Sequence, residues 1–138
     1  MNNIKIIGSA VAENSGGIYR TNVSSSNHVY IADEPTEFGG NGEGPAPTDY
    51  LCMALSSCKA ITMRMYAKRK AWQLKVVKVK TTFVKADQMP SGKNTFFCVV
   101  TLTGELSEDQ VRRILEISKV CPIDRLLGKP SDIVTTSE

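Results

Sequence analysis

One segment in the middle of the chain, from Thr48 to about Ala71, favours a single long helix and most constrains what the chain can fold into. Its apolar and small residues recur at three- and four-residue steps, at Leu51, Leu55, Cys58, Ile61, Thr62 and Met65. Positive charge begins only at Lys59 and then gathers near the end, where cations suit the negative end of the helix dipole. We therefore expect a helix that is buried along its first half and solvated near its end.

Strand patterns flank this helix on both sides. Three short strands are expected before it, at residues 4–11, 17–23 and 28–32, with a hairpin turn at 24–27. Two longer strands are expected after it, at residues 73–85 and 95–106. In the first of these two, valines alternate with lysines, which predicts a sheet with one wet face.

Turn and cap signals divide the remaining residues. Residues 33–47 are rich in proline and glycine and predict a long loop, and loops of that length often line sites. Ser107–Gln110 has the form of a capping box and predicts the start of a second helix. Pro122 can begin a short helix that Gly128 ends, and a last strand fits residues 133–136.

Length and composition limit the classes of function. The 138 residues predict one globular domain, 1–138, with a single core. The net charge of +3 comes from scattered lysines and arginines, which favours a solvated face over nucleic-acid binding. No apolar run reaches membrane-spanning length, and the first residues lack the pattern of a secretory signal. We therefore expect a cytoplasmic protein, in which paired cysteines are more often catalytic or metal-binding than structural.

The cysteine spacing argues against a metal site. The chain has no C-x-x-C pair, and its only histidine, His28, falls in a predicted strand. Cys52 and Cys58 lie six residues apart, on different sides of the predicted helix, and cannot bond to each other. Cys98 in a strand and Cys52 are most simply small core residues. We expect neither a metal nor a cofactor.

Cys58 and Cys121 have more specific settings. A cysteine on an apolar helical stripe is usually inert, but Ser56 and Ser57 leave space around the sulfur of Cys58. Cys121 is either a simple helix-end residue or a thiol presented by the irregular backbone that Cys121–Pro122 creates. If the fold brings the two sulfurs together, the chain carries a dithiol that can be oxidised and reduced.

Several motifs together resemble a known family. They are Asp33–Pro35, Gly39–Gly40, Gly44–Pro47, Leu55–Cys58, Thr62–Arg69 and Cys121–Ile123. In this combination and spacing the chain resembles the OsmC/Ohr superfamily (osmotically inducible protein C and organic hydroperoxide resistance proteins), and it is most similar to the YhfA-like branch. The resemblance covers nearly the whole chain.

The resemblance implies an α+β, OsmC-like fold in which antiparallel sheets pack around a long central helix, and an intertwined homodimer. It also implies a thiol peroxidase that serves as an antioxidant. In the family's terms Cys58 is the peroxidatic cysteine and Cys121 the resolving one, and the two form a redox-active disulfide. Arg20 and Asp49 match the arginine and the carboxylate that complete the site. An external dithiol, of the lipoyl type or a small thiol, would then reduce the disulfide.

Chemistry agrees with these implied roles. A free thiol has a pKa of about 8.5, so Cys58 needs a cation such as Arg20 to become a thiolate at neutral pH. Asp49 would hold that arginine in place by a charge-assisted hydrogen bond. Asp49 is shorter than the family's glutamate and stands one position away, so Glu34 or Glu37 are alternatives. Arg20 can serve its own subunit or the partner.

Three functions stay open at the level of sequence. The first is a peroxidase for organic hydroperoxides, with hydrogen peroxide as a weaker substrate. The second is an OsmC-like protein that senses redox state or binds a small ligand without efficient turnover. The third is a structural dimer with inert thiols. A Cys58 pKa near or above 8.5, with no peroxide-induced disulfide, would favour the second or third.

Overall fold

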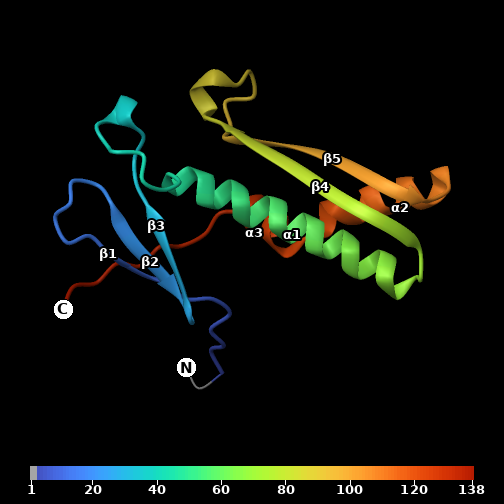
Figure 1. Ribbon diagram of the computed structural model, residues 1–138, viewed down its shortest axis with the longest axis horizontal. Coiled ribbons are helices and arrows are strands. Elements are labelled where there is room, and N and C mark those ends of the chain that lie inside the picture. Colours follow the sequence, from blue (N-terminus) through green and yellow to red (C-terminus); the bar gives the residue numbers. More distant parts are fainter. Residues whose placement is uncertain (1–2) are drawn as a thin grey trace. The chain divides into compact units, whose positions relative to one another are not determined.

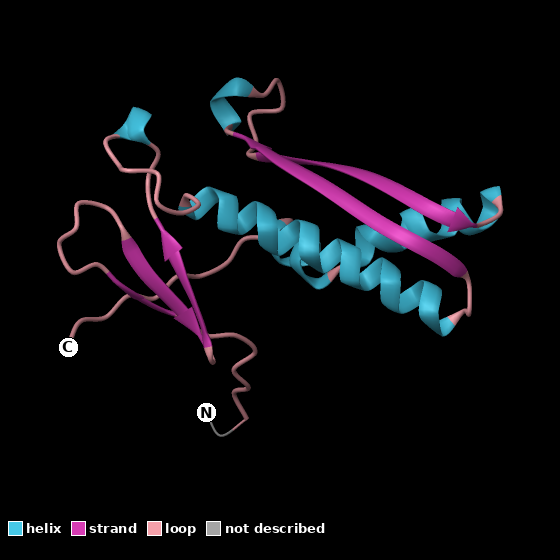
Figure 2. Cartoon of the chain, in the orientation of Figure 1, coloured by secondary structure: helices cyan, strands magenta, loops and turns pink. Residues whose placement is uncertain are grey.

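The computed structural model describes residues 3–138 and falls into two compact units, Met1–Tyr50 and Leu51–Glu138. Each unit contains one antiparallel sheet (Figure 1). The longest helix, α1, runs from Pro47 to Arg69 and therefore begins in the first unit and continues in the second. Figure 2 shows the same elements coloured by type. The predicted α+β class and the long helix are confirmed, whereas the single domain and the intertwined dimer stay predictions.

The first unit is a three-stranded antiparallel meander in the order β1-β2-β3. Its strands are β1 (Val11–Glu13), β2 (Thr21–Ser25) and β3 (His28–Ala32). The β2–β3 hairpin turns tightly, because Ser25 pairs with His28 and Ser26 between them has a φ of 52°. The predicted meander is confirmed, but the strand expected at residues 4–11 begins only at Val11. Ile6 and Ile7 are 79% and 93% exposed, so nothing within residues 3–138 covers them.

The loop after β3 is ordered by a buried carboxylate. Asp33 is 2% exposed, and its two oxygens accept the backbone N–H groups of Glu34 at 2.7 Å and Glu43 at 3.0 Å. Gly40 passes so close to this segment that a Cβ there would lie 1.9 Å from the Glu34 carbonyl oxygen. The loop also contains the 3₁₀ helix η1 (Thr36–Phe38) before α1 begins. The proline- and glycine-rich segment is therefore a fixed structure.

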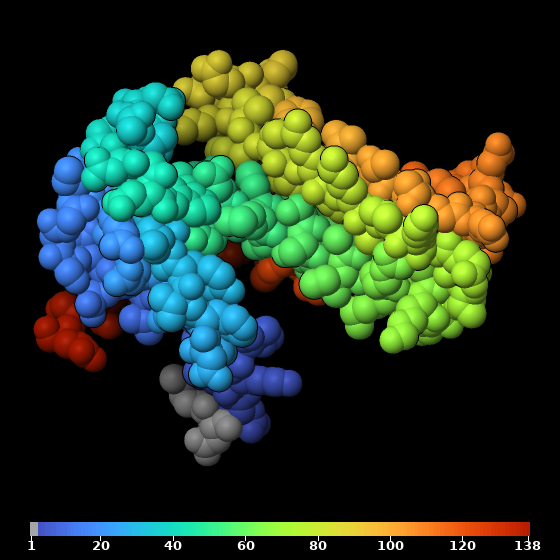
Figure 3. Space-filling model, in the orientation of Figure 1, coloured from blue at the N-terminus to red at the C-terminus, as the bar shows by residue number. Residues whose placement is uncertain are grey.

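The second unit is built on a long antiparallel hairpin, β4 (Gln73–Val84) and β5 (Thr95–Glu105), with the 3₁₀ helix η2 (Ala86–Gln88) at its turn. Both strands are confirmed close to their predicted bounds, and β4 half-buries Val77, Val79 and Val84 while exposing its lysines and Val76. The hairpin has an irregular register between Leu74 and Val76, opposite Gly104, whose φ is 138°. In Figures 1 and 3 strand β4 lies along α1.

A hydrophobic core joins α1 to this hairpin and to helix α2 (Glu108–Ile117). Its buried members are Met63, Tyr66, Ala67, Leu74 and Ile114. Helix α2 begins with the predicted capping box, in which Ser107 accepts the N–H of Gln110 and Gln110 accepts the N–H of Ser107. This reciprocal pair satisfies two N–H groups that a helix start leaves unpaired.

The buried face of α1 differs from the predicted stripe. Ile61 and Met65 are 58% and 65% exposed, whereas Lys59 is only 5% exposed and lies between Leu55 and Met63 on the buried face. The expectation that charge marks the solvated part of the helix is therefore wrong at Lys59. The physical reason is a partner on another element, because Asp124 forms an ion pair with it.

The chain ends in short helices. The 3₁₀ helix η3 (Ser118–Val120) leads through Cys121 into α3 (Pro122–Leu127), which Gly128 caps as predicted. The strand predicted at residues 133–136 is not formed, and Ile133 and Val134 are 90% and 87% exposed, without a neighbouring strand to pair with. Within residues 3–138, no helix is both long and apolar enough to cross a membrane.

Candidate functional site

The structure brings the two singled-out cysteines together inside the second unit. Cys58 is half-buried on α1, and Cys121 is 0% exposed at the start of α3. A hydrogen bond between the two side chains is one of the causes that raise the pKa of Cys121. Neither cysteine is in a disulfide. Two thiols 63 positions apart in sequence, at residues 58 and 121, therefore lie close enough in the reduced protein for Cys58 to act on the ionisation of Cys121.

Local backbone chemistry explains how Cys121 is presented. Proline disfavours a helical conformation in the residue before it, and Cys121 accordingly has an extended backbone, with φ −71° and ψ 146°. Pro122 then opens α3, where its missing N–H costs nothing. The Cys121 sulfur accepts the backbone N–H of Asp124 at 3.3 Å and so caps the helix. The Cys–Pro pair thus fixes both the position and the direction of the thiol.

Several groups set the ionisation of Cys121. Burial raises the pKa of the Cys121 thiol most strongly, and contact with Cys58 raises it further. The N–H of Asp124 and the charge of Lys59 act in the opposite direction. The net direction is upward, so Cys121 is protonated at neutral pH and can donate its S–H to the sulfur of Cys58.

An ion pair between a buried lysine and a partly exposed aspartate lies beside Cys121. The Lys59 Nζ lies 2.5 Å from the Asp124 Oδ2 and donates a second hydrogen bond, of 2.7 Å, to the Ser118 carbonyl oxygen. The Lys59 side chain is 6% exposed and that of Asp124 is 41% exposed. Sequence reasoning missed this pair. The available signal was a cation inside the apolar first half of the long helix, together with an unexplained carboxylate just after Cys–Pro–Ile.

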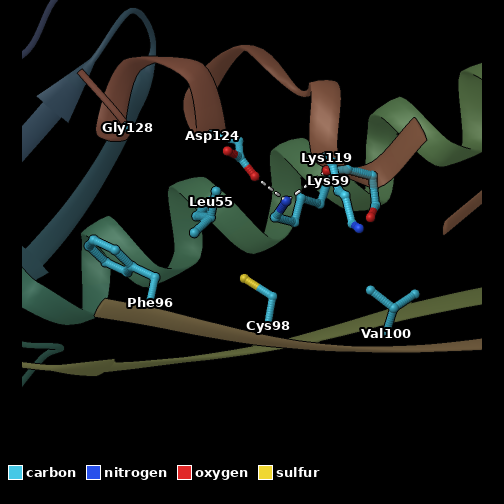
Figure 4. A pocket seen from close by; sticks show the side chains of 9 residues that line it. Leu55, Lys59, Phe96, Cys98, Val100, Lys119, Asp124 and Gly128 are labelled. Carbon is cyan, nitrogen blue, oxygen red and sulfur yellow. Dashed lines mark hydrogen bonds and ion pairs between the residues drawn. The ribbon is translucent and has the colours of Figure 1, made fainter. Parts of the chain in front are cut away.

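A cavity of about 310 Å³ opens next to this ion pair. Its lining comes from α1, β5 and the η3–α3 segment: Leu55, Lys59, Phe96, Cys98, Val100, Ser118, Lys119, Asp124 and Gly128. Figure 4 shows the Cys98 sulfur directed from β5 toward α1, with the Lys59–Asp124 pair on the opposite wall. Cys98 also contacts the Thr81 hydroxyl at 3.4 Å. Cys98 is thus half-buried at a cavity wall, and Cys52 is half-buried on α1.

The other two predicted site residues, Arg20 and Asp49, belong to the first unit. The Asp49 Oδ2 accepts the backbone N–H of Ala46 at 3.0 Å, which is a helix-capping contact. Arg20 is exposed, and its charge helps to lower the pKa of Asp33. The main cause of that lowered pKa is the hydrogen bond from the Glu43 N–H. The roles proposed for Arg20 and Asp49 in catalysis stay predictions, and Asp33 is a carboxylate that sequence reasoning overlooked.

The first unit also has a cavity, of about 500 Å³. Its lining includes Tyr19, Ala32, Asp33, Glu34 and Tyr50. The Tyr50 hydroxyl donates to the Ile31 carbonyl oxygen at 2.6 Å, so it is held in place at the wall. Glu34 is half-buried beside this cavity, whereas Glu37 is exposed on η1.

Comparison with models of protein families gives one match. Residues 40–136 match the family model described as OsmC-like protein. A sequence comparison with curated proteins found no match. Among solved structures, a Psychrobacter arcticus 273-4 protein, provisionally described as an osmotic stress induced and detoxification response protein, is 22% identical, with a TM-score of 0.73 and coverage of 90% of each chain.

Two further solved structures have the same fold. An OsmC-like protein from Mycoplasma pneumoniae is 17% identical, with a TM-score of 0.72 and coverage of 91% of this chain and 89% of its own. An organic hydroperoxide resistance protein OsmC from Legionella pneumophila is 15% identical, with a TM-score of 0.65 and coverage of 91% of each chain. At these identities the similarity concerns the fold.

Proposed function

The chain belongs to the OsmC-like protein family, and from that membership we propose that it is a thiol-dependent peroxidase that reduces organic hydroperoxides and, more weakly, hydrogen peroxide. The observation that carries the proposal is the proximity of a half-buried Cys58 to a fully enclosed Cys121. A half-buried thiol can meet a small oxidant. A second thiol already close to it can complete a disulfide without a large movement of the chain.

The first step takes place at Cys58. Its thiolate attacks the hydroperoxide, an S–O bond forms, and the O–O bond breaks. Cys58 becomes a sulfenic acid, and the departing alkoxide takes up a proton to leave as an alcohol.

The second step uses Cys121. After losing its proton, the Cys121 sulfur attacks the sulfur of the Cys58 sulfenic acid, the S–S bond forms, and hydroxide leaves to become water. An external dithiol, of the lipoyl type or a small thiol, then reduces the disulfide and is itself oxidised. No cofactor takes part in this cycle.

The roles of Arg20 and Asp49 in the proposal rest on the family resemblance. Arg20 would bring a positive charge to the peroxidatic thiol, and a carboxylate would orient the guanidinium group. The capping contact of Asp49 with Ala46 makes this residue a weaker candidate for that carboxylate. Asp33 joins Glu34 and Glu37 as an alternative, because Arg20 already acts on its ionisation.

We also propose that the protein is a cytoplasmic homodimer. The apolar residues that α1 leaves exposed support a second copy as the partner, with Leu51 47%, Ile61 58% and Met65 65% exposed. Large apolar side chains in this number on one helix are typical of a covered surface. Light scattering coupled to gel filtration gives the mass, and a mass of one chain, 15.1 kDa, would exclude the dimer.

Disulfide mapping tests the proposed activity. Reduced protein is treated with cumene hydroperoxide or hydrogen peroxide, and the disulfides are mapped by mass spectrometry. We expect a Cys58–Cys121 bond in the wild type, no turnover in Cys58→Ser, and a trapped sulfenic or over-oxidised Cys58 in Cys121→Ser. Cys98→Ser is the matched control, because its thiol lines the nearby cavity but does not contact Cys121 in the proposed cycle.

Two results would overturn the assignment. A peroxide-induced bond through Cys52 or Cys98 would move the site. An unreactive Cys58 with an ordinary thiol pKa would favour a binding or sensing protein.

A further inference from the structure

Lys59 occupies a position that an apolar residue would ordinarily fill. It lies one helical turn from Leu55 and one from Met63, on the face of α1 that is buried in the second unit. Removing an ammonium group from water is costly, and its attraction to a carboxylate often only offsets that cost. A well-packed apolar pair at the same place is frequently as stable or more stable. The pair is therefore poorly explained by stability alone.

The hydrogen bonds of the Lys59–Asp124 ion pair all involve the segment around Cys121. The Lys59 Nζ donates to the Ser118 carbonyl oxygen, three residues before Cys121, and to the Asp124 carboxylate, three residues after it. The Asp124 N–H donates to the Cys121 sulfur. Since Lys59 directly follows Cys58 in sequence, one side chain ties the turn of α1 that carries the first thiol to the segment that carries the second.

We propose that Lys59 and Asp124 are positioning residues for the resolving thiol: their ion pair holds Cys121 against Cys58 and keeps a positive charge next to the sulfur that must attack. This proposal rests on the proposed function, because it concerns the second step of the cycle. Cys121 must be enclosed to stay next to Cys58, and enclosure works against its ionisation. The ammonium group of Lys59 offsets part of that effect without exposing the sulfur to water.

The pair is active in the step that forms the disulfide. The Cys121 S–H gives up its proton, the resulting thiolate attacks the sulfur of the Cys58 sulfenic acid, and the S–O bond breaks as hydroxide leaves and takes up a proton to become water. A nearby cation stabilises the thiolate form, so a larger fraction of the protein is ready to attack at a given pH. Each unit of thiol pKa changes that fraction about tenfold at pH values below the pKa.

Other charged and titratable groups lie near Cys121 and the Lys59–Asp124 pair. Cys58 lies on α1 beside Lys59, Cys98 faces the adjoining cavity from β5, and Lys119 lines that cavity from η3. Lys119 is exposed and is not among the groups that affect the ionisation of Cys121. Lys119→Met is therefore a matched control for Lys59→Met, because the same charge is removed from the same cavity wall.

The first experiment measures the ionisation of Cys121 without any peroxide. Ultraviolet absorbance of the thiolate is recorded against pH in full-length Cys58→Ser protein, and the curve of Cys58→Ser/Cys121→Ser is subtracted. Lys59→Met should raise the Cys121 pKa, Asp124→Asn should lower it by leaving the Lys59 charge unneutralised, and Lys59→Arg should preserve it. Lys119→Met should leave it unchanged.

A merely structural anchor predicts a different pattern. If the pair only holds α3 in place, both single substitutions expose Cys121 and both lower its pKa toward that of a free thiol. That result would overturn the proposal. Because a buried charge without its partner can unfold a protein, the double variant Lys59→Met/Asp124→Leu provides an apolar pair of similar volume. In a folded double variant the pKa of Cys121 should rise as in Lys59→Met.

The second experiment measures resolution itself. Wild type and variants, with Cys58 restored, receive one equivalent of cumene hydroperoxide, and a sulfenic-acid probe follows the lifetime of the Cys58 intermediate. Lys59→Met and the folded double variant should lengthen that lifetime about tenfold for each unit of pKa increase at neutral pH. An unchanged lifetime overturns the positioning role. If wild type forms no sulfenic acid, the proposed peroxidase fails, whereas the titration still decides how Lys59 affects Cys121.

Discussion

The two methionines of α1 provide a direct test of which helix face forms the core. Met63 is 0% exposed and belongs to the buried cluster of the second unit, whereas Met65, two residues later, is 65% exposed. The same substitution to alanine at each position removes the same atoms from the same helix. Helix propensity changes equally at the two sites, so any difference in the free energy of unfolding reports burial.

The expected cost at Met63 has two parts. Loss of a fully buried methionine side chain removes about 1.5–3 kcal/mol of favourable transfer from water. The cavity left among Tyr66, Leu74 and Ile114 adds to this, and the total for such substitutions is about 2–5 kcal/mol. Met65→Ala should cost about 0.5 kcal/mol or less, as exposed positions usually do. A cost of about 3 kcal/mol at Met63 would lower the melting temperature by roughly 10 °C.

Urea unfolding followed by circular dichroism gives both free energies. The measurement is repeated at several protein concentrations, because Met65 lies on the face that we propose a second subunit covers. A loss at Met65 that grows with protein concentration belongs to that interface. Concentration-independent losses of equal size at Met63 and Met65 would refute the assignment of the buried face.

Three further predictions concern the backbone and the titrating groups. Gly104→Ala should destabilise the fold by about 1–3 kcal/mol, because the φ of Gly104 is 138° and a Cβ there would lie 2.1 Å from the Gln73 carbonyl oxygen. Gly92→Ala should cost less, because nothing lies within 4 Å of the added Cβ. Urea unfolding measures both free energies. Because the pKa of Asp33 is lowered in the folded state, its carboxylate stabilises the fold at pH values above the unfolded-state pKa of about 3.9. The free energy of unfolding should therefore decrease as the pH falls below that value, and Asp33→Asn should remove this part of the pH dependence. The raised pKa of Cys121 makes the free energy of unfolding depend on pH in the opposite direction. The stabilisation is complete below the unfolded pKa of about 8.5 and is lost as the pH rises through the higher pKa of the folded state. Wild type under reducing conditions should therefore lose stability in base more steeply than Cys121→Ser.

Features of the fold that depend on residues adjacent in the sequence were predictable. The bounds of α1, the alternation along β4 and the capping box at Ser107 all follow from local patterns, and the structure confirms them. The strand predicted at 133–136 failed because a strand needs a partner, and nothing local says whether the chain supplies one.

The site was predictable only in part, for a related reason. Cys58 and Cys121 stood out because each has an unusual immediate setting, and the family pattern joined them. Lys59 was misplaced because a charged residue is normally solvated, and its partner Asp124 is 65 positions away. Asp33 was overlooked because the N–H groups that hold it belong to an irregular loop whose path no periodicity reveals.

The unequal enclosure of the two sulfurs gives the proposed catalytic cycle a direction. Cys121 is 0% exposed, so an incoming thiolate from a reductant can approach the disulfide only from the side of Cys58. The reductant is then held for a moment as a mixed disulfide on α1, while Cys121 departs and regains its proton inside the protein. Bulky reagents are thereby kept from the inner sulfur, and the outer one becomes the single docking point through which electrons enter.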